Sequence, residues 1–164
     1  MEDHNSPEAI AARANQEDPI VMYLIVRESL GMGMGKTAAQ CAHASQMLTL
    51  EYFEMKDHSR DVQRVLKLPP SELGEVARAT YKEEYAALSR KLSIMGEWLN
   101  SSFRKVVLRA SDKEWEKLKL IPNHVLVVDA GLTEIAAGSE TVIGVWPMRK
   151  SARPKILTKL QVLK

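Results

Sequence analysis

The sequence predicts an α/β protein, a three-layer α/β/α sandwich around a four-stranded, mixed and partly parallel sheet. Residues 21–26 are six apolar residues without alternation, a pattern typical of a strand that is buried on both faces. The first strand is therefore expected at about residues 20–28. Further apolar strand candidates are separated by segments with helical spacing, so strands and helices alternate along the chain. Such alternation places helices on both faces of a sheet.

A glycine-rich turn and a helix follow the first strand. Gly31, Gly33 and Gly35 can adopt positive φ or allow another group to approach the backbone closely. Thr37 and Gln40 have the Thr-x-x-Gln spacing of a capping box, which predicts that the helix begins at Thr37. The first turns of this helix carry small apolar residues nearly all round, so the helix can pack closely against the sheet.

The middle of the chain predicts a second, longer helix. The first helix fades near Asp57, and the charged segment that follows ends in two consecutive prolines. Ser71 is a good N-cap, and apolar residues keep helical spacing from there to Asn100. At about 1.5 Å per residue this helix would be about 40 Å long. We expect a helix of this length to project from the domain.

The last third of the chain contains the other strands and two further helices. Ser111 and Glu114 form a Ser-x-x-Glu capping box, which predicts a short helix that ends near Leu118. This helix lies between the second and third strands. The remaining elements are expected as strands at residues 105–109, 125–128 and 141–145 and as a final helix at residues 152–163.

Composition and charge are those of an ordinary globular protein of 164 residues, with a formal net charge of +2. We interpret residues 1–18 as a flexible polar tail and residues 19–164 as a single domain. Cys41 is the only cysteine, so no internal disulfide can form. No segment is long and apolar enough to span a membrane, and the N-terminus does not resemble a signal peptide, which makes the cytoplasm the expected compartment. The C-terminal residues 149–164 are basic and suit a polyanion or form a solvated face.

Two polar positions are expected to meet at one edge of the sheet. Lys36 follows the first strand, and Asp129 follows the third. In sheets of this class, ligands bind at the carboxyl ends of parallel strands. If the first and third strands run in the same direction, Lys36 and Asp129 share one pocket.

A P-loop nucleotide-binding enzyme is one interpretation, because Gly-Lys-Thr follows a buried strand and opens a helix. The P-loop requires the spacing G-x-x-x-x-G-K-[ST]. Leu30 stands where its first glycine should be, and Gly31 is one residue too close. A nest of backbone N–H groups that is one residue short would not present the same donors to phosphates.

A second interpretation uses more of the chain. The run MGMGKTAAQCAHA at residues 32–44 resembles the M-G-K-G-K-x-A-A-Q-C-x-H-A segment of the type 2 peptidyl-tRNA hydrolase family. The run DAGLTEIAAGSETVIG at residues 129–144 resembles that family's D-A-G-R-T-x-I-A-P-G-x-x-T-V-x-G segment. The resemblance covers about residues 20–54 and 101–164, and two long patterns in the right order are far more specific than one glycine-rich turn.

The sequence departs from the family pattern at three positions within these runs. Met34 replaces a lysine, Leu132 replaces an arginine, and Ala137 replaces a proline. Residues 55–100 resemble a helical insertion. A binding protein that keeps the fold without the activity is therefore a third interpretation.

The resemblance implies hydrolysis of the ester that joins a peptide to the 3′ ribose of tRNA, without a metal or another cofactor. It implies Lys36, Asp129 and Thr133 as catalytic residues, with Asp129 either activating water or positioning Lys36. His43 is assigned to substrate binding or packing rather than to catalysis. No His or Cys spacing suggests a metal site, and the family implies a homodimer. The implied substrate-binding residues are Gly35, Gln40, His43, Gly131 and Thr141.

Overall fold

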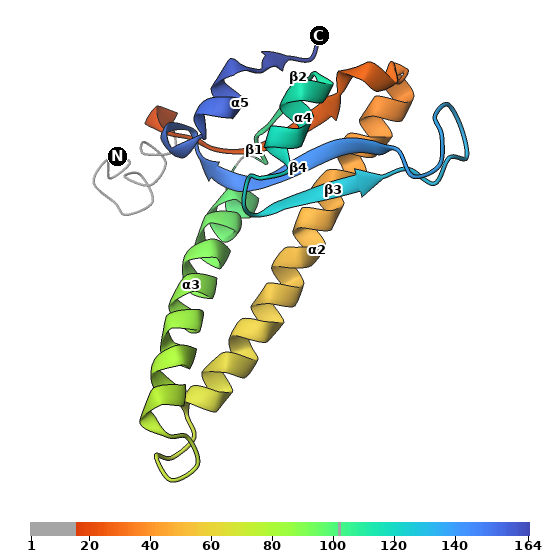
Figure 1. The fold of residues 1–164 in the computed structure, drawn as a ribbon. Coiled ribbons are helices and arrows are strands. Elements are labelled where there is room, and N and C mark those ends of the chain that lie inside the picture. Colours follow the sequence, from red (N-terminus) through yellow and green to blue (C-terminus); the bar gives the residue numbers. More distant parts are fainter. Residues whose placement is uncertain (1–15, 102) are drawn as a thin grey trace.

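A computed structural model describes residues 16–101 and 103–164 and contains a five-stranded sheet with the strand order β3-β4-β1-β2-β5 (Figure 1). β1 and β2 are parallel, and the other neighbouring pairs are antiparallel. The predicted mixed sheet is thus confirmed, with one short strand more than expected. The strands are β1 (Ile20–Arg27), β2 (Lys105–Ala110), β3 (His124–Val128), β4 (Glu140–Arg149) and β5 (Gln161–Val162).

Helices cover both faces of the sheet, as the three-layer prediction requires (Figure 1). α2 and α3 pack on one face together with half of the β1 side chains, and α4 and α5 pack on the other face with the rest. Two short 3-10 helices, η1 (Glu28–Leu30) and η2 (Lys150–Ala152), follow β1 and β4. The α-helices are α2 (Met34–Leu66), α3 (Glu75–Asn100), α4 (Asp112–Leu118) and α5 (Lys155–Lys159).

The position of β1 between two layers of helices explains why apolar and polar residues do not alternate in its sequence. Met22 and Leu24 point to the core beneath α2 and α3, whereas Tyr23 and Ile25 point to the core beneath α4 and α5. Successive side chains of a strand point to opposite faces of the sheet. Because helices cover both faces here, every position of the strand must be apolar.

α2 and α3 form a long antiparallel pair that extends well beyond the sheet (Figure 1). The expected end of the first helix near Asp57 is wrong, because α2 continues to Leu66. Ser59 and Val62 are buried in this extension, where α3 supplies the packing surface that sequence periodicity alone does not reveal. α3 begins at Glu75 rather than at Ser71. That residues 55–100 are an insertion stays a prediction.

The C-terminus also differs from the prediction. The expected helix at residues 152–163 is limited to the five residues of α5, which follows Pro154. The chain then becomes extended, and β5 pairs with β2 in the antiparallel direction. Leu163 N donates a hydrogen bond to Val107 O over 3.0 Å. The edge of β2 offers backbone partners that a further helical turn could not use, so strand pairing replaces the helix.

The predicted flexible tail at residues 1–18 lies mostly outside the described residues and stays a prediction. Among the helices that the structure describes, none combines the length and the apolar character that crossing a membrane requires.

Close packing between α2 and β4 depends on Gly144. A Cβ atom at this position would lie 3.0 Å from Val125 Cγ2 and 3.1 Å from Ala44 Cβ. We expect Gly144→Ala to lower the free energy of unfolding by about 1–3 kcal/mol, because these buried neighbours must move apart. Chemical denaturation monitored by circular dichroism measures this change.

Gly96→Ala is the matched control for that experiment. Gly96 lies within α3, and its added Cβ would have only an ordinary contact, 3.8 Å from Tyr52 Oη. Alanine inside a helix is expected to stabilise the protein by about 0.5–1 kcal/mol relative to glycine. Equal effects of the two substitutions would contradict the packing argument.

Candidate active site

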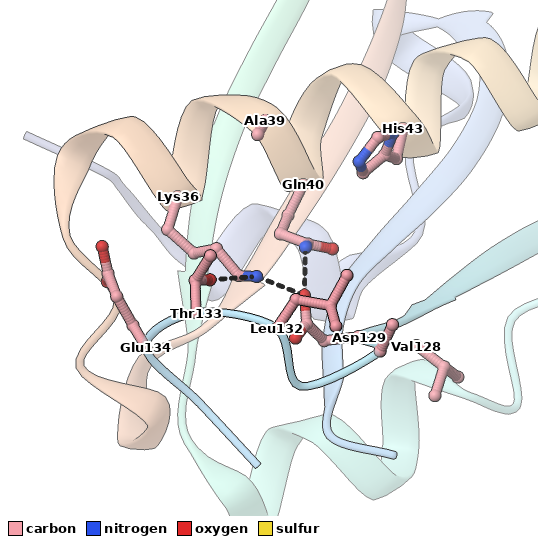
Figure 2. Close-up of a pocket in the computed structure, with 10 residues that line it drawn as sticks. Lys36, Ala39, Gln40, His43, Val128, Asp129, Leu132, Thr133 and Glu134 are labelled. Carbon is pink, nitrogen blue, oxygen red and sulfur yellow. Dashed lines mark hydrogen bonds and ion pairs between the residues drawn. The ribbon is translucent and has the colours of Figure 1, made fainter. Parts of the chain in front are cut away.

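The site lies where the start of α2 meets the loop that follows β3 (Figure 2). β1 and β3 are both antiparallel to the β4 strand between them, so they run in the same direction. The carboxyl ends of β1 and β3 therefore lie at the same edge of the sheet. A pocket of about 500 Å³ opens there, and its lining includes Lys36, Asp129 and Thr133.

Lys36 and Asp129 form an ion pair in this pocket (Figure 2). Lys36 Nζ contacts Asp129 Oδ2 and donates a hydrogen bond to Thr133 Oγ1 over 2.9 Å. The two side chains of the ion pair are 12% and 5% exposed, respectively. An ammonium group has three N–H donors, so two are used here and one is left for a ligand in the pocket. The expected meeting of residues 36 and 129 is confirmed.

Gln40 binds the same oxygen of Asp129 as Lys36 does. Gln40 Nε2 donates a hydrogen bond to Asp129 Oδ2 over 2.6 Å, and Gln40 Oε1 accepts one from Thr141 Oγ1 over 2.8 Å. Thr141 Oγ1 also lies 3.1 Å from Val127 O. All three side chains of this chain of hydrogen bonds are buried. Because a hydroxyl donates to its oxygen, the Gln40 amide must direct its nitrogen towards Asp129.

The loop after β3 presents Asp129 with a fixed orientation. Gly131 N donates a hydrogen bond to Asp129 Oδ1 over 2.8 Å, and Gly131 has φ of +76°. A Cβ atom at Gly131 would lie 2.4 Å from Ala137 N, so only glycine fits this turn. At the base of the loop, Asp129 N donates a hydrogen bond to Ser139 O over 2.9 Å, and Gly138 N donates one to Asp129 O over 2.8 Å.

These contacts lower the pKa of Asp129 below its ordinary value of 3.8. The hydrogen bond from Lys36 is the largest cause, followed by the hydrogen bond from Gly131 N. Burial acts in the opposite direction, and the Lys36 charge and Gln40 add smaller lowering effects. Donors that bind the ionised form favour it, so Asp129 is a carboxylate at neutral pH.

The start of α2 differs from the predicted capping box. The helix begins at Met34 with Gly33 as its N-cap, and Thr37 Oγ1 donates to Met32 O over 3.4 Å instead of capping. Gly33 N donates to Glu134 Oε2 over 2.8 Å, so a carboxylate from the distant loop satisfies the helix start. An acidic group at this position is also favoured by the helix dipole.

The conformations of the three glycines weigh against a P-loop. Gly31 has φ of +58°, whereas Gly33 has φ of −61° and Gly35 lies within the helix. The residues therefore do not form a nest of successive N–H groups around a phosphate. Gly33 instead shows the expected close approach, because a Cβ there would lie 3.2 Å from Glu134 Oε1. At Gly35 the expectation is wrong, because its φ is not positive and a Cβ would meet no atom within 4 Å.

The other predicted substrate-binding residues lie in different surroundings. His43 lines the pocket and is exposed, two turns along α2 from Lys36 (Figure 2). Gly35 is exposed in the first turn of α2, and a Cβ there would meet no atom within 4 Å. Gly131 donates a hydrogen bond to Asp129, and Thr141 donates one to Gln40, rather than facing the open pocket.

Sequence reasoning did not assign Glu134, Ala39 or Val128 to this site. All three line the pocket, as does Leu132, which is 87% exposed. Glu134 directly follows Thr133 in the second motif, and this adjacency to a predicted site residue is the sequence feature that could have indicated its place in the pocket. Within residues 16–101 and 103–164, no group of three His, Cys, Asp or Glu side chains could hold a metal ion. Metal independence stays a prediction.

Comparison with known proteins agrees with both motifs. The family model described as "Peptidyl-tRNA hydrolase PTH2" matches residues 20–163. Peptidyl-tRNA hydrolase 2 of Saccharomyces cerevisiae is 33% identical over 148 residues, which cover 86% of this chain and 57% of the yeast protein. The mitochondrial peptidyl-tRNA hydrolase 2 of Homo sapiens is 29% identical over 150 residues, covering 88% of this chain and 64% of the human protein.

An archaeal relative matches over nearly its whole length. The peptidyl-tRNA hydrolase of Methanopyrus kandleri is 32% identical over 149 residues, which cover 86% of this chain and 96% of the archaeal protein. The chain thus spans about three fifths of the yeast and human relatives but almost all of the archaeal one. A family match across both motifs and all five strands leads to one conclusion: this chain belongs to the peptidyl-tRNA hydrolase PTH2 family.

Proposed function

We propose that this protein hydrolyses peptidyl-tRNA at the ester between the peptide and the 3′ ribose. The observation that carries the proposal is the ion pair of Lys36 and Asp129 in a pocket with Thr133 beside it. Family membership and the names of the relatives support the same activity. Ester hydrolysis needs a positioned water and a donor for the oxyanion that develops on the carbonyl.

In the proposed reaction, the water oxygen attacks the ester carbonyl carbon, and the bond from that carbon to the 3′ oxygen breaks. The free N–H of Lys36 donates to the carbonyl oxygen as negative charge develops there. The Thr133 hydroxyl lies beside Lys36 and orients the water. One proton from water reaches the departing 3′ oxygen, and the other is released to solvent when the new carboxylic acid ionises, so the products are a peptide carboxylate and tRNA with a free 3′ hydroxyl.

Asp129 acts in this proposal by positioning Lys36 and accepting a hydrogen bond from water. Its lowered pKa makes it a weak proton acceptor, which argues against full proton abstraction. Gln40 and Thr141 are positioning residues, since they orient the Asp129 carboxylate. A homodimer belongs to the proposal as a feature that the family implies, and a cytoplasmic location belongs to it as the expectation from the sequence.

Incubation with N-acetyl-aminoacyl-tRNA tests the proposed activity. We expect the wild-type protein to release the N-acetyl-amino acid, and Lys36→Ala to lower kcat/KM by about 10²-fold or more because oxyanion stabilisation is lost. Lys113→Ala is the matched control, because Lys113 is an exposed lysine on α4. Absence of cleavage with retained tRNA binding would instead support a binding protein without activity.

Asp129 provides a test that depends on pH. Because its pKa is lowered, the Asp129 side chain stays ionised from about pH 7 to about pH 5. It becomes protonated only as the pH falls through the lowered pKa. Its contribution to stability and activity should therefore be constant across that range. Lys36→Met should raise the pKa of Asp129, since the largest cause of the lowering is removed.

A carbon-13 NMR titration of the Asp129 carboxyl group measures its pKa in the wild-type protein and in Lys36→Met. Thr133→Val serves as the control, because it leaves Lys36 next to Asp129. Titration of Asp129 above pH 3.8 in the wild-type protein would contradict the assigned contacts.

A further inference from the structure

The strand that leads into the site has one open edge. β3 is the outermost strand of the sheet, and β4 is its single strand neighbour within the described residues. Figure 1 shows β3 at the rim, with α2 crossing one face of this part of the sheet. The side chains of residues 124–126 are only partly buried, and Val128 is 55% exposed. An edge strand presents N–H and C=O groups that another extended chain can bind.

The pairing with β4 determines which backbone groups face outward. Trp146 N donates to Asn123 O over 3.0 Å, so Asn123 forms a hydrogen-bonded pair with β4. In an antiparallel ladder such pairs alternate with pairs whose backbone groups point the other way. Val125 and Val127 therefore bond towards β4, and His124 and Leu126 direct their N–H and C=O groups to the open edge.

The composition of β3 leaves this edge unprotected. Proteins commonly protect edge strands with lysine, proline or very short length. The opposite edge, β5, is only two residues long, whereas β3 has five residues and contains no lysine, proline or acidic residue. Its sequence, His-Val-Leu-Val-Val, strongly favours an extended conformation.

β3 also runs directly into the catalytic pocket. Val128 is its last residue, Asp129 follows, and both line the pocket. In Figure 2, Val128 and His43 lie at one end of the pocket, and Glu134 lies at the other end beside the start of α2. The end next to β3 is thus apolar or weakly polar, and the opposite end carries a carboxylate.

We propose that the peptide part of peptidyl-tRNA binds as an additional strand along the open edge of β3. The backbone groups of His124 and Leu126 bind the peptide backbone, and Val128 and Leu132 contact the residues next to the ester. This inference rests on the proposed hydrolase function. Strand addition uses main-chain groups for affinity, and these groups are the same in every peptide. The site would therefore accept peptides with little regard to their sequence.

The spacing of β3 gives this proposal a register. Leu126 lies three residues before Asp129, which corresponds to about 10 Å in an extended strand. The substrate residue that pairs with Leu126 is therefore about the third from the ester. Because successive residues of an added strand point alternately towards and away from β3, its backbone N–H groups should matter alternately.

Substrates with single N-methyl groups test this alternation. Pentapeptidyl-tRNAs are methylated at the backbone nitrogen of the second, third or fourth residue from the ester, and kcat/KM is measured with the wild-type protein. We expect methylation of the nitrogens that face β3 to lower kcat/KM about fivefold, the effect of one lost hydrogen bond. Methylation of the intervening nitrogen serves as the matched control and should have a smaller effect. Equal effects at all three positions would overturn the proposal.

Two variants of Leu126 test the same contact from the side of the protein. Leu126→Pro removes the outward N–H, and proline is tolerated in an edge strand where that group faces solvent. Leu126→Ala removes the side chain but keeps the N–H, so it is the matched control. We expect the ratio of kcat/KM for pentapeptidyl-tRNA to kcat/KM for N-acetyl-aminoacyl-tRNA to fall about fivefold in the proline variant relative to the alanine variant.

The ratio separates the possible failures. If neither substrate is cleaved by the wild-type protein, the proposed hydrolase function itself is wrong. If both are cleaved and the two Leu126 variants have equal ratios, the function stands and strand addition is overturned. If sedimentation shows a wild-type dimer and a monomeric proline variant with an unchanged ratio, the edge binds a second copy of the chain, which also overturns the proposal.

Discussion

The carboxylate of Asp129 is the interaction on which the site depends. It binds Lys36 and Gln40 from α2 and the Gly131 amide from its own loop, so three donors from two segments meet at its two oxygen atoms. A buried carboxylate without donors would be strongly unfavourable, and here every nearby donor favours the ionised form. The same contacts that lower the pKa of Asp129 therefore also hold the lysine where a substrate carbonyl could reach it.

Close approach of α2 to the sheet makes this arrangement possible. Ala44 and Leu48 are completely buried against β4, where Gly144 leaves room for them. Larger residues at this contact would lift the helix away from the sheet and move Gln40 out of reach of Asp129. The small apolar residues in the first turns of α2 thus help to position the side chains of the pocket, through the distance that they set between two layers. The far half of α2 instead packs against α3, outside the sheet.

The mixed direction of the sheet places the pocket next to an open edge. β3 and β1 run in the same direction, so their ends supply both halves of the site, but β4 lies between them. This order leaves β3 outermost, with its carboxyl end at the pocket. A substrate with a polypeptide attached to an ester could then use both features at once, the pocket for the ester and the edge for the chain. A fully enclosed β3 would offer only side chains.

The sequence by itself determined the strand order along the chain, the three layers and the meeting of Lys36 with Asp129. These features follow from local patterns, namely unbroken apolar strands and polar residues at their carboxyl ends, which need no knowledge of distant contacts. The tertiary structure decided which hydrogen-bond partners the groups at the ends of helices and strands find. Gln40 resembles a local capping residue but binds Asp129, because a distant carboxylate is a stronger acceptor than a nearby backbone group. Glu134 caps the start of α2 instead of Gln40, and β5 forms where a helix was expected. Local patterns do not show either feature, because Glu134 and Gly33, like β5 and β2, lie more than fifty residues apart.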